Sequence, residues 1–144
     1  MLKAVFLTDA FYRAYPNSKY SEIEQKNDRP YIRIQVMVNG VLWGIPMRSN
    51  IQHQYAVWTD EENRCGLDLT KAVVITKPAK YISGVTPRIR DNEFKVLKQL
   101  SEYNVIQKFR KYIHDYKKAK KVMHVKRNRD LVSFSTLQYF EKYI

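Results

Sequence analysis

Two runs of apolar, β-branched residues separated by a two-residue turn form the clearest pattern in the chain. The runs cover residues 32–38 and 41–45, and Asn39 and Gly40 lie between them. Both turn residues tolerate the positive φ angles of a type I′ turn, which joins neighbouring antiparallel strands. We therefore predict a β-hairpin, whose second strand leads into a polar cluster at residues 46–50.

The other segments before about residue 85 have the composition of strands joined by polar connections. Residues 3–7 and 67–75 are predicted to be strands, with 79–82 as a continuation of the second. Residues 11–19 fit a short helix or an irregular turn, and the polar stretch 51–62 is predicted to be a loop between strands. We expect this part of the chain to be mainly sheet.

After Pro87 the apolar period becomes that of an amphipathic helix. Asp91 is placed to cap its start, and either one long helix or two helices joined near residues 103 and 104 fit the pattern. Capping-box spacing at 135–138 predicts a terminal helix to about residue 143, and the intervening 122–130 is predicted to be a basic loop or strand. The apolar positions that recur every three or four residues are Phe94, Leu97, Leu100, Tyr103, Ile106, Phe109, Ile113 and Tyr116.

Length and composition favour one domain over residues 1–144, mainly sheet in about 1–85 and mainly helical in about 88–144. A chain of 144 residues with 44% apolar content can bury a real core. The single cysteine excludes an internal disulfide and fits a reducing cytosol. No apolar run approaches the roughly 20 residues that span a bilayer, and charges interrupt the N-terminus too early for a signal peptide. We expect a soluble, cytoplasmic protein with no membrane partner.

The net charge of +12 and the pI near 9.8 favour a polyanionic partner, with nucleic acid first. Residues 108–129 carry ten Lys or Arg against one acid, Asp115, and so hold nine of the twelve net positive charges. Tyr112 and Tyr116 lie within this stretch and either pack in the core, which we favour, or stack on unpaired bases. The predicted RNA-binding residues are Tyr31, Asn50, Lys111, Lys117, Lys118, Lys120, Lys121, Lys126 and Arg127.

The predicted hairpin brings Arg29 and the 46–50 cluster to the same end of the sheet, where they suit a phosphodiester. Arg29 and Arg48 can each donate two hydrogen bonds to phosphate oxygens. Ser49 has no nucleophile-elbow context, so it is either a turn residue or a hydrogen-bond donor to the scissile phosphate or the 2′-hydroxyl. His53 is either the proton donor or acceptor of the site or an exposed polar residue.

Metal-dependent and nucleotide-hydrolysing enzymes are disfavoured. The acidic run at 60–62 points in several directions on any regular element, so it is a poor chelator, and we expect no metal. The four glycines are isolated, so no Gly-rich phosphate loop exists. Cleavage of RNA by its own 2′-hydroxyl needs neither a metal site nor a phosphate-binding loop. It requires only proton transfer and stabilisation of the charged phosphorane.

The order of several short motifs resembles that of the toxins of type III toxin–antitoxin systems, the ToxN, AbiQ and TenpN proteins, and most of all the TenpN branch. The motifs are Pro-Asn at 16–17, basic-X-aromatic-Ile at 29–32, the Asn-Gly turn, Pro-X-X-Ser at 46–49, Leu-X-Leu at 67–69 and Lys-Gln-Leu at 98–100. Ser49 matches the family's important serine. Arg29 stands where the family usually has lysine, and Arg48 where it usually has Thr or Ser.

This resemblance implies an α+β endoribonuclease, with a strongly twisted antiparallel sheet and packed helices, related in fold to the MazF and Kid toxins. It implies sequence-selective, metal-independent cleavage of single-stranded cellular or phage RNA to 2′,3′-cyclic phosphate and 5′-hydroxyl ends, with no cofactor. A small repeat RNA antitoxin, cut from its precursor by the toxin, would inhibit the enzyme in a cyclic toxin–RNA assembly. The expected catalytic residues are Ser49, Arg29, Arg48 and His53.

A non-catalytic, basic RNA-binding protein is the alternative, because it needs the charge and the aromatic residues but no site around Ser49. A DNA-binding regulator is disfavoured, because the basic helical region has no convincing helix-turn-helix pattern.

Overall fold

The computed structural model describes residues 2–25 and 31–144 and has an α+β architecture. Within these residues, six strands form an antiparallel sheet of order β1-β2-β3-β5-β4, and β6 also pairs with β3. The predicted α+β class with an antiparallel sheet and packed helices is confirmed. The strands are β1 (Lys3–Val5), β2 (Arg33–Val38), β3 (Val41–Arg48), β4 (Ala56–Asp60), β5 (Cys65–Asp68) and β6 (Val73–Val74).

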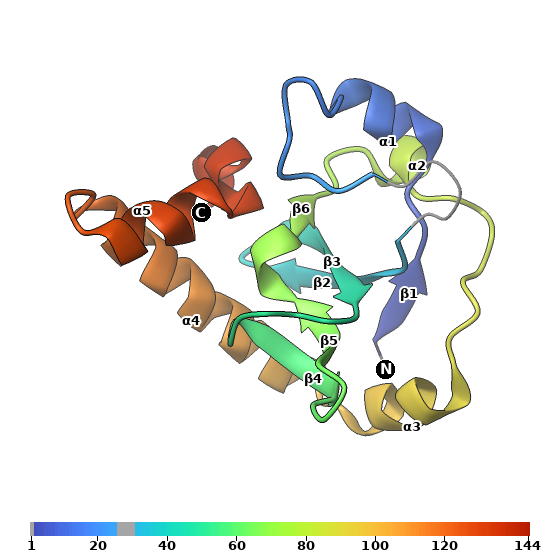
Figure 1. The fold of residues 1–144 in the computed structure, drawn as a ribbon. Coiled ribbons are helices and arrows are strands. Elements are labelled where there is room, and N and C mark those ends of the chain that lie inside the picture. The colour runs from blue at the N-terminus through green and yellow to red at the C-terminus, as the bar shows by residue number, and fades with distance from the viewer. Residues whose placement is uncertain (1, 26–30) are drawn as a thin grey trace.

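Four of the α-helices pack in two pairs around this sheet. Figure 1 shows α4 and α5 together on one side, while α1 lies beside α2 at the other. The helix α3 contacts β4, and α4 contacts β2. The α-helices are α1 (Asp9–Ala14), α2 (Pro78–Tyr81), α3 (Asp91–Gln99), α4 (Glu102–Lys120) and α5 (Lys126–Ser133), and the 3₁₀ turns are η1 (Leu69–Lys71), η2 (Thr136–Tyr139) and η3 (Glu141–Tyr143).

The predicted hairpin is confirmed as β2 and β3. Asn39 and Gly40 have φ angles of 52° and 77°, so both turn residues are in the left-handed region that a type I′ turn requires. The second strand is longer than predicted and continues through Arg48, because its last two residues pair with Leu67 and Gly66 of β5. This extension carries Ser49 to the edge where β3 leaves the sheet.

The prediction of a loop over 51–62 is wrong for the part that forms β4. Ala56, Val57 and Thr59 are buried, and β4 pairs with β5 through a register shift between Trp58 and Asp60. The Arg64 guanidinium lies 4.5 Å from the centre of the Trp58 ring and covers it. Pairing with β5 and this cation–π contact stabilise the strand. The polar residues on either side of it gave the sequence the pattern of a loop.

The prediction of one strand over 67–75 is also wrong, because a side chain interrupts it. The carboxylate of Asp68 accepts a hydrogen bond from the backbone N–H of Thr70 at 3.0 Å and caps η1. Local capping of this kind competes with the ladder of a strand. The expected strand continuation at 79–82 is the helix α2, which Pro78 starts, and Ile82 alone of these residues forms a bridge, with Leu7.

The predicted change to helical structure after Pro87 is confirmed, but the expected cap at Asp91 and the expected junction near residues 103 and 104 are wrong. Two helices form, and they separate at Leu100 and Ser101 because the Ser101 hydroxyl accepts a hydrogen bond from Asn104 N at 3.1 Å and caps α4. The break therefore comes before residues 103 and 104. Arg90 is the N-cap of α3, and Asp91 lies in its first turn. A carboxylate at this position stabilises the helix through a favourable interaction with the helix dipole.

The end of the chain differs more from the prediction. The expected loop or strand at 122–130 is wrong from Lys126 onward, where α5 begins and packs on α4. Ser135 caps η2 by accepting from Leu137 N at 3.1 Å, so the cap position is confirmed. The expected terminal helix is instead two 3₁₀ turns, η2 and η3.

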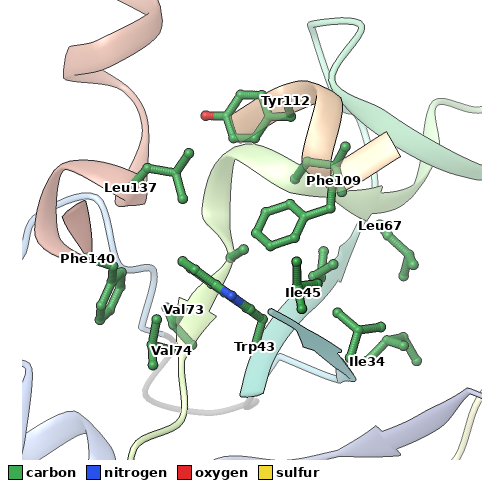
Figure 2. Packing of buried hydrophobic residues seen from close by; sticks show 14 of the residues in the cluster. Ile34, Trp43, Ile45, Leu67, Val73, Val74, Phe109, Tyr112, Leu137 and Phe140 are labelled. Atoms are coloured by element: carbon green, nitrogen blue, oxygen red, sulfur yellow. The ribbon is translucent and has the colours of Figure 1, made fainter. Parts of the chain in front are cut away.

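The core is centred on Trp43 of β3, which is 1% exposed. Figure 2 shows its ring between Phe109 of α4 and Phe140. The ring centroids lie 5.0 and 6.0 Å apart, and both contacts are edge-to-face. Tyr112 is buried one turn further along α4 and donates to the Ser135 hydroxyl at 2.5 Å. Tyr116 is buried as well, so core packing is confirmed for both tyrosines of the basic stretch.

We predict that Phe109→Ala lowers the free energy of unfolding by about 3–5 kcal/mol, because it removes a ring from the centre of a packed core. Urea denaturation followed by circular dichroism measures this loss. Tyr103→Ala is the matched control on the same helix, because Tyr103 is 68% exposed, and we expect it to change stability by less than about 0.5 kcal/mol. Equal losses in the two variants would contradict the packing role of Phe109.

Candidate functional site

A cavity of about 650 Å³ opens beside the end of β3, and we call it the Ser49 groove. Arg48 and Ser49 line it from β3, and Tyr31 lines it from the residues just before β2. Residues from 86–90 and from the start of α3 also line it. They contribute the side chains of Arg88, Arg90 and Glu93.

Arg48 is held by two carboxylates. Its Nη1 lies 2.6 Å from Oδ2 of Asp68, and its Nη2 lies 2.9 Å from Oε1 of Glu24. The guanidinium is therefore engaged through both of its terminal nitrogens. Arg48 lies where the sequence predicts it, at the end of the hairpin, but in this arrangement its charge is already balanced.

Asp68 is fully buried and is the centre of this network. Besides Arg48, its carboxylate accepts from the Thr70 hydroxyl at 2.6 Å and from Thr70 N at 3.0 Å, and its Oδ1 lies 3.1 Å from Nε2 of His53. Burial acts to raise the pKa of Asp68, but the hydrogen bonds from His53, Thr70 and Arg48 outweigh it and hold the pKa below its ordinary value.

His53 has both ring nitrogens engaged. Its Nδ1 accepts a hydrogen bond from the backbone N–H of Tyr55 at 3.0 Å, which places the proton of the neutral ring on Nε2, facing Asp68. The exposed part of the ring lines a second cavity of about 720 Å³, between the 53–55 loop, α4 and α5. We call this cavity the α4–α5 groove.

The structure thus divides the predicted catalytic residues. Ser49 and Arg48 line the Ser49 groove, whereas His53 lines the α4–α5 groove, and the side chain of Asp68 connects Arg48 to His53. Arg29 lies outside the described residues. Ser49 itself is exposed and takes part in none of the hydrogen bonds among the described residues, so its hydroxyl is available to a ligand.

Two predicted RNA-binding residues lie near the end of β3. Tyr31 lines the Ser49 groove, and burial followed by the hydrogen bond with Glu24 raises its pKa to about 12, so the phenol keeps its proton. Asn50 is exposed with a φ of 55°, and its Oδ1 accepts from Gln52 Nε2 at 2.6 Å. Tyr31 is thus a proton-bearing group in the groove, whereas Asn50 shapes the turn after Ser49.

The basic residues of α4 and α5 are of two kinds. Lys111, Lys120 and Lys126 form ion pairs with Asp115, Glu141 and Asp130 at 3.2, 2.6 and 2.7 Å. The remaining predicted residues are exposed and pair with no acid among the described residues. They are Lys117, Lys118, Lys121 and Arg127. Lys118 and Arg127 line the α4–α5 groove beside Phe134, whose ring is 63% exposed.

Several residues of the site were missed by the sequence analysis. Asp68 had a signal, because a carboxylate in the middle of an apolar run needs buried partners. Glu93 is buried and accepts from the Thr59 hydroxyl at 3.0 Å and from Arg90 Nε at 2.7 Å, which ties α3 to β4. No local pattern marks Arg88 or Arg90, because the chain brings them to Ser49 from about forty residues away.

No protein family, characterised protein or solved structure matches this chain. Within residues 2–25 and 31–144, no three His, Cys, Asp or Glu side chains converge as a metal site would require. No helix in those ranges has the length and apolar character to cross a membrane. The residues and their arrangement are therefore what bears on function.

We predict that Asp68→Asn destabilises the fold by about 3–5 kcal/mol at pH 7, because it leaves the half-buried Arg48 without its closest counter-charge. The difference in the free energy of unfolding between the wild type and Asp68→Asn should become smaller as the pH falls. The folded-state pKa of Asp68 is depressed, so its contribution is complete above about pH 5 and is lost as the pH falls through the folded-state value. Urea denaturation of both proteins between pH 7 and pH 3 measures it.

Asp130→Asn is the control for this experiment, because Asp130 forms a surface pair with Lys126 and its side chain is 43% exposed. We expect it to cost less than about 1 kcal/mol. A deficit for Asp68→Asn that stays constant down to pH 3 would show that the charge of Asp68 is not what stabilises the site.

Proposed function

We propose that this protein is an endoribonuclease toxin of a type III toxin–antitoxin system and that it cleaves single-stranded RNA in the Ser49 groove without a metal ion. The observation that carries the proposal is the position of Ser49. It is an exposed hydroxyl at the end of a hairpin, in a groove lined by three arginines. The motif resemblance supports the same residue independently.

The chemistry requires little of the protein. The 2′-hydroxyl of the substrate attacks the adjacent phosphorus, the bond to the 5′-oxygen breaks, and a 2′,3′-cyclic phosphate and a 5′-hydroxyl result. Donors aimed at the phosphorane oxygens lower the barrier, because charge develops there. Ser49 would donate to a phosphate oxygen or contact the 2′-hydroxyl, and the protonated phenol of Tyr31 is a second donor in the groove.

Arg48 and His53 have positioning roles in this proposal. Arg48 holds the end of β3 to Asp68 and Glu24, and so sets where the next residue, Ser49, lies. His53 completes the hydrogen bonding of Asp68 from the other groove. Arg29 keeps its expected role of contacting the phosphate.

The basic face of α4 and α5 would bind the RNA antitoxin, the substrate or both. The α4–α5 groove combines cations, Lys118 and Arg127, with aromatic side chains, Tyr55 and Phe134. Single-stranded nucleic acid is held in this way, with the backbone along the cations and the bases stacked on rings. The antitoxin would be a small repeat RNA bound in a cyclic toxin–RNA assembly, and the substrate would be cellular or phage RNA.

A non-catalytic RNA-binding protein is the second candidate, because Lys117, Lys118 and Lys121 do not line the Ser49 groove and can bind RNA without Ser49. The two candidate functions predict different results for a variant that lacks the Ser49 hydroxyl. Loss of Ser49 leaves a binding protein unaffected, whereas it inactivates a nuclease.

We predict that purified wild-type protein cuts a mixed-sequence, single-stranded RNA at discrete positions in excess EDTA, and that Ser49→Ala reduces the rate by about 100-fold or more. Fragment-end mapping should find 2′,3′-cyclic phosphates. Ser18→Ala is the control, because Ser18 is an exposed serine that lines neither groove, and it should cleave like the wild type. Expression of the wild type, but not of Ser49→Ala, should also arrest growth.

Cleavage by Ser49→Ala at the wild-type rate would contradict the proposed site. RNA that stays intact but shifts on a gel, with protein shown to be free of copurified RNA, would favour the binding protein.

We also predict that changing Lys117, Lys118 and Lys121 together to Gln weakens RNA binding and flattens its salt dependence, by about 0.7 in the log–log slope for each lost phosphate contact. Filter binding between 50 and 300 mM salt measures both effects. A control with the same change in charge replaces the exposed Lys77, Lys80 and Lys95, which lie outside α4 and α5. Equal effects of the two triple variants would show that net charge, and not this face, attracts RNA.

A further inference from the structure

The three arginines of the Ser49 groove differ in how far their charge is already balanced. Arg48 faces the carboxylates of Asp68 and Glu24. Arg90 forms an ion pair with Glu93, to which its Nε also donates at 2.7 Å. By contrast, Arg88 is exposed and takes part in no ion pair or hydrogen bond among the described residues.

The chain is anchored on both sides of Arg88, which lines the groove. At one end of the segment, Ser83 N donates to Phe6 O at 2.8 Å, next to β1. At the other end α3 begins at Asp91 and is tied to β4 through Glu93 and Thr59. Pro87 is buried and Ile89 is half-buried, so the neighbours of Arg88 pack inward while Arg88 remains exposed.

An exposed arginine and a free serine hydroxyl that line the same cavity suit one ligand chemistry well. A guanidinium donates two parallel hydrogen bonds to a phosphate and stays charged at any physiological pH. Arg88 and Ser49 both line the cavity of about 650 Å³, which falls in the range of about 300–1,000 Å³ typical of small-ligand sites and so can hold a nucleotide.

We propose that Arg88 binds a backbone phosphate of the RNA strand in the Ser49 groove and is the phosphate ligand that this chain supplies from outside the hairpin. This inference rests on the proposed function, because it names a binding residue of the same site. It assigns to Arg88 the direct contact that the sequence analysis expected of Arg48, and Arg48 becomes a positioning residue.

The test compares Arg88→Gln with Arg13→Gln. Arg13 is an exposed arginine of α1 that does not line the groove, so the two variants have the same change in charge. Two measurements are made on each protein. The first is kcat/KM for cleavage of a labelled single-stranded RNA in EDTA. The second is the salt dependence of binding to the 2′-deoxy analogue of that strand, which has no 2′-hydroxyl to attack.

For Arg88→Gln we expect a loss of about 100-fold in kcat/KM, typical of removing a group that stabilises transition-state charge, and a log–log salt slope smaller by about 0.7, the value for one phosphate contact. Arg13→Gln should match the wild type in both. Because Arg88 is exposed, the variant should unfold at the wild-type urea concentration.

The outcomes separate this inference from the proposed function. Wild-type cleavage by Arg88→Gln, or slower cleavage with an unchanged salt slope, overturns the role of Arg88 and leaves the nuclease standing. A wild-type protein that binds the strand without cleaving RNA overturns the nuclease, and the slope difference between the variants then decides whether Arg88 contacts a phosphate. A wild-type protein that binds neither strand overturns both.

Discussion

The buried carboxylate of Asp68 is the interaction on which the arrangement of the rest of the site depends. It ends β5, caps η1, and holds Arg48 and His53 at 2.6 and 3.1 Å. A buried charge costs several kcal/mol unless its partners are complete. Thr70 supplies the remaining hydrogen bonds from two residues further on. The end of β3, the turn into η1 and the 53–55 loop therefore have to form together.

This constraint explains the layout of the two grooves. Because Asp68 binds Arg48 from one side and His53 from the other, the Ser49 groove and the α4–α5 groove open on opposite sides of one buried side chain. In the proposed function, RNA would be cleaved in the Ser49 groove and bound along the α4–α5 groove. Among the described residues that line the grooves, the charges without an ion pair are Arg88 in the first and Lys118 and Arg127 in the second.

Sequence-based reasoning succeeded where a signal is local. The Asn39 and Gly40 turn, the helical period after Pro87 and the cap at Ser135 depend on neighbouring residues, and the structure has all three. It failed at β4, a short apolar run within a polar stretch, and at α5, whose sequence is mainly polar; these segments become strand and helix through pairing with β5 and packing on α4. It failed at η1 because the Asp68 side chain accepts a hydrogen bond from Thr70 N. This contact caps a 3₁₀ turn where a continuous strand was predicted.

The sequence by itself determined the hairpin that carries Ser49, the amphipathic α4 with its buried tyrosines, and the concentration of charge in residues 108–129. Each depends on the order of residues within one element. Only the tertiary structure decided that Arg48 is bound by Glu24 and Asp68, and that Arg88 lines the same groove as Ser49. Ion pairs and cavities join residues that are distant along the chain, so neither composition nor spacing encodes which arginine is left free for a phosphate.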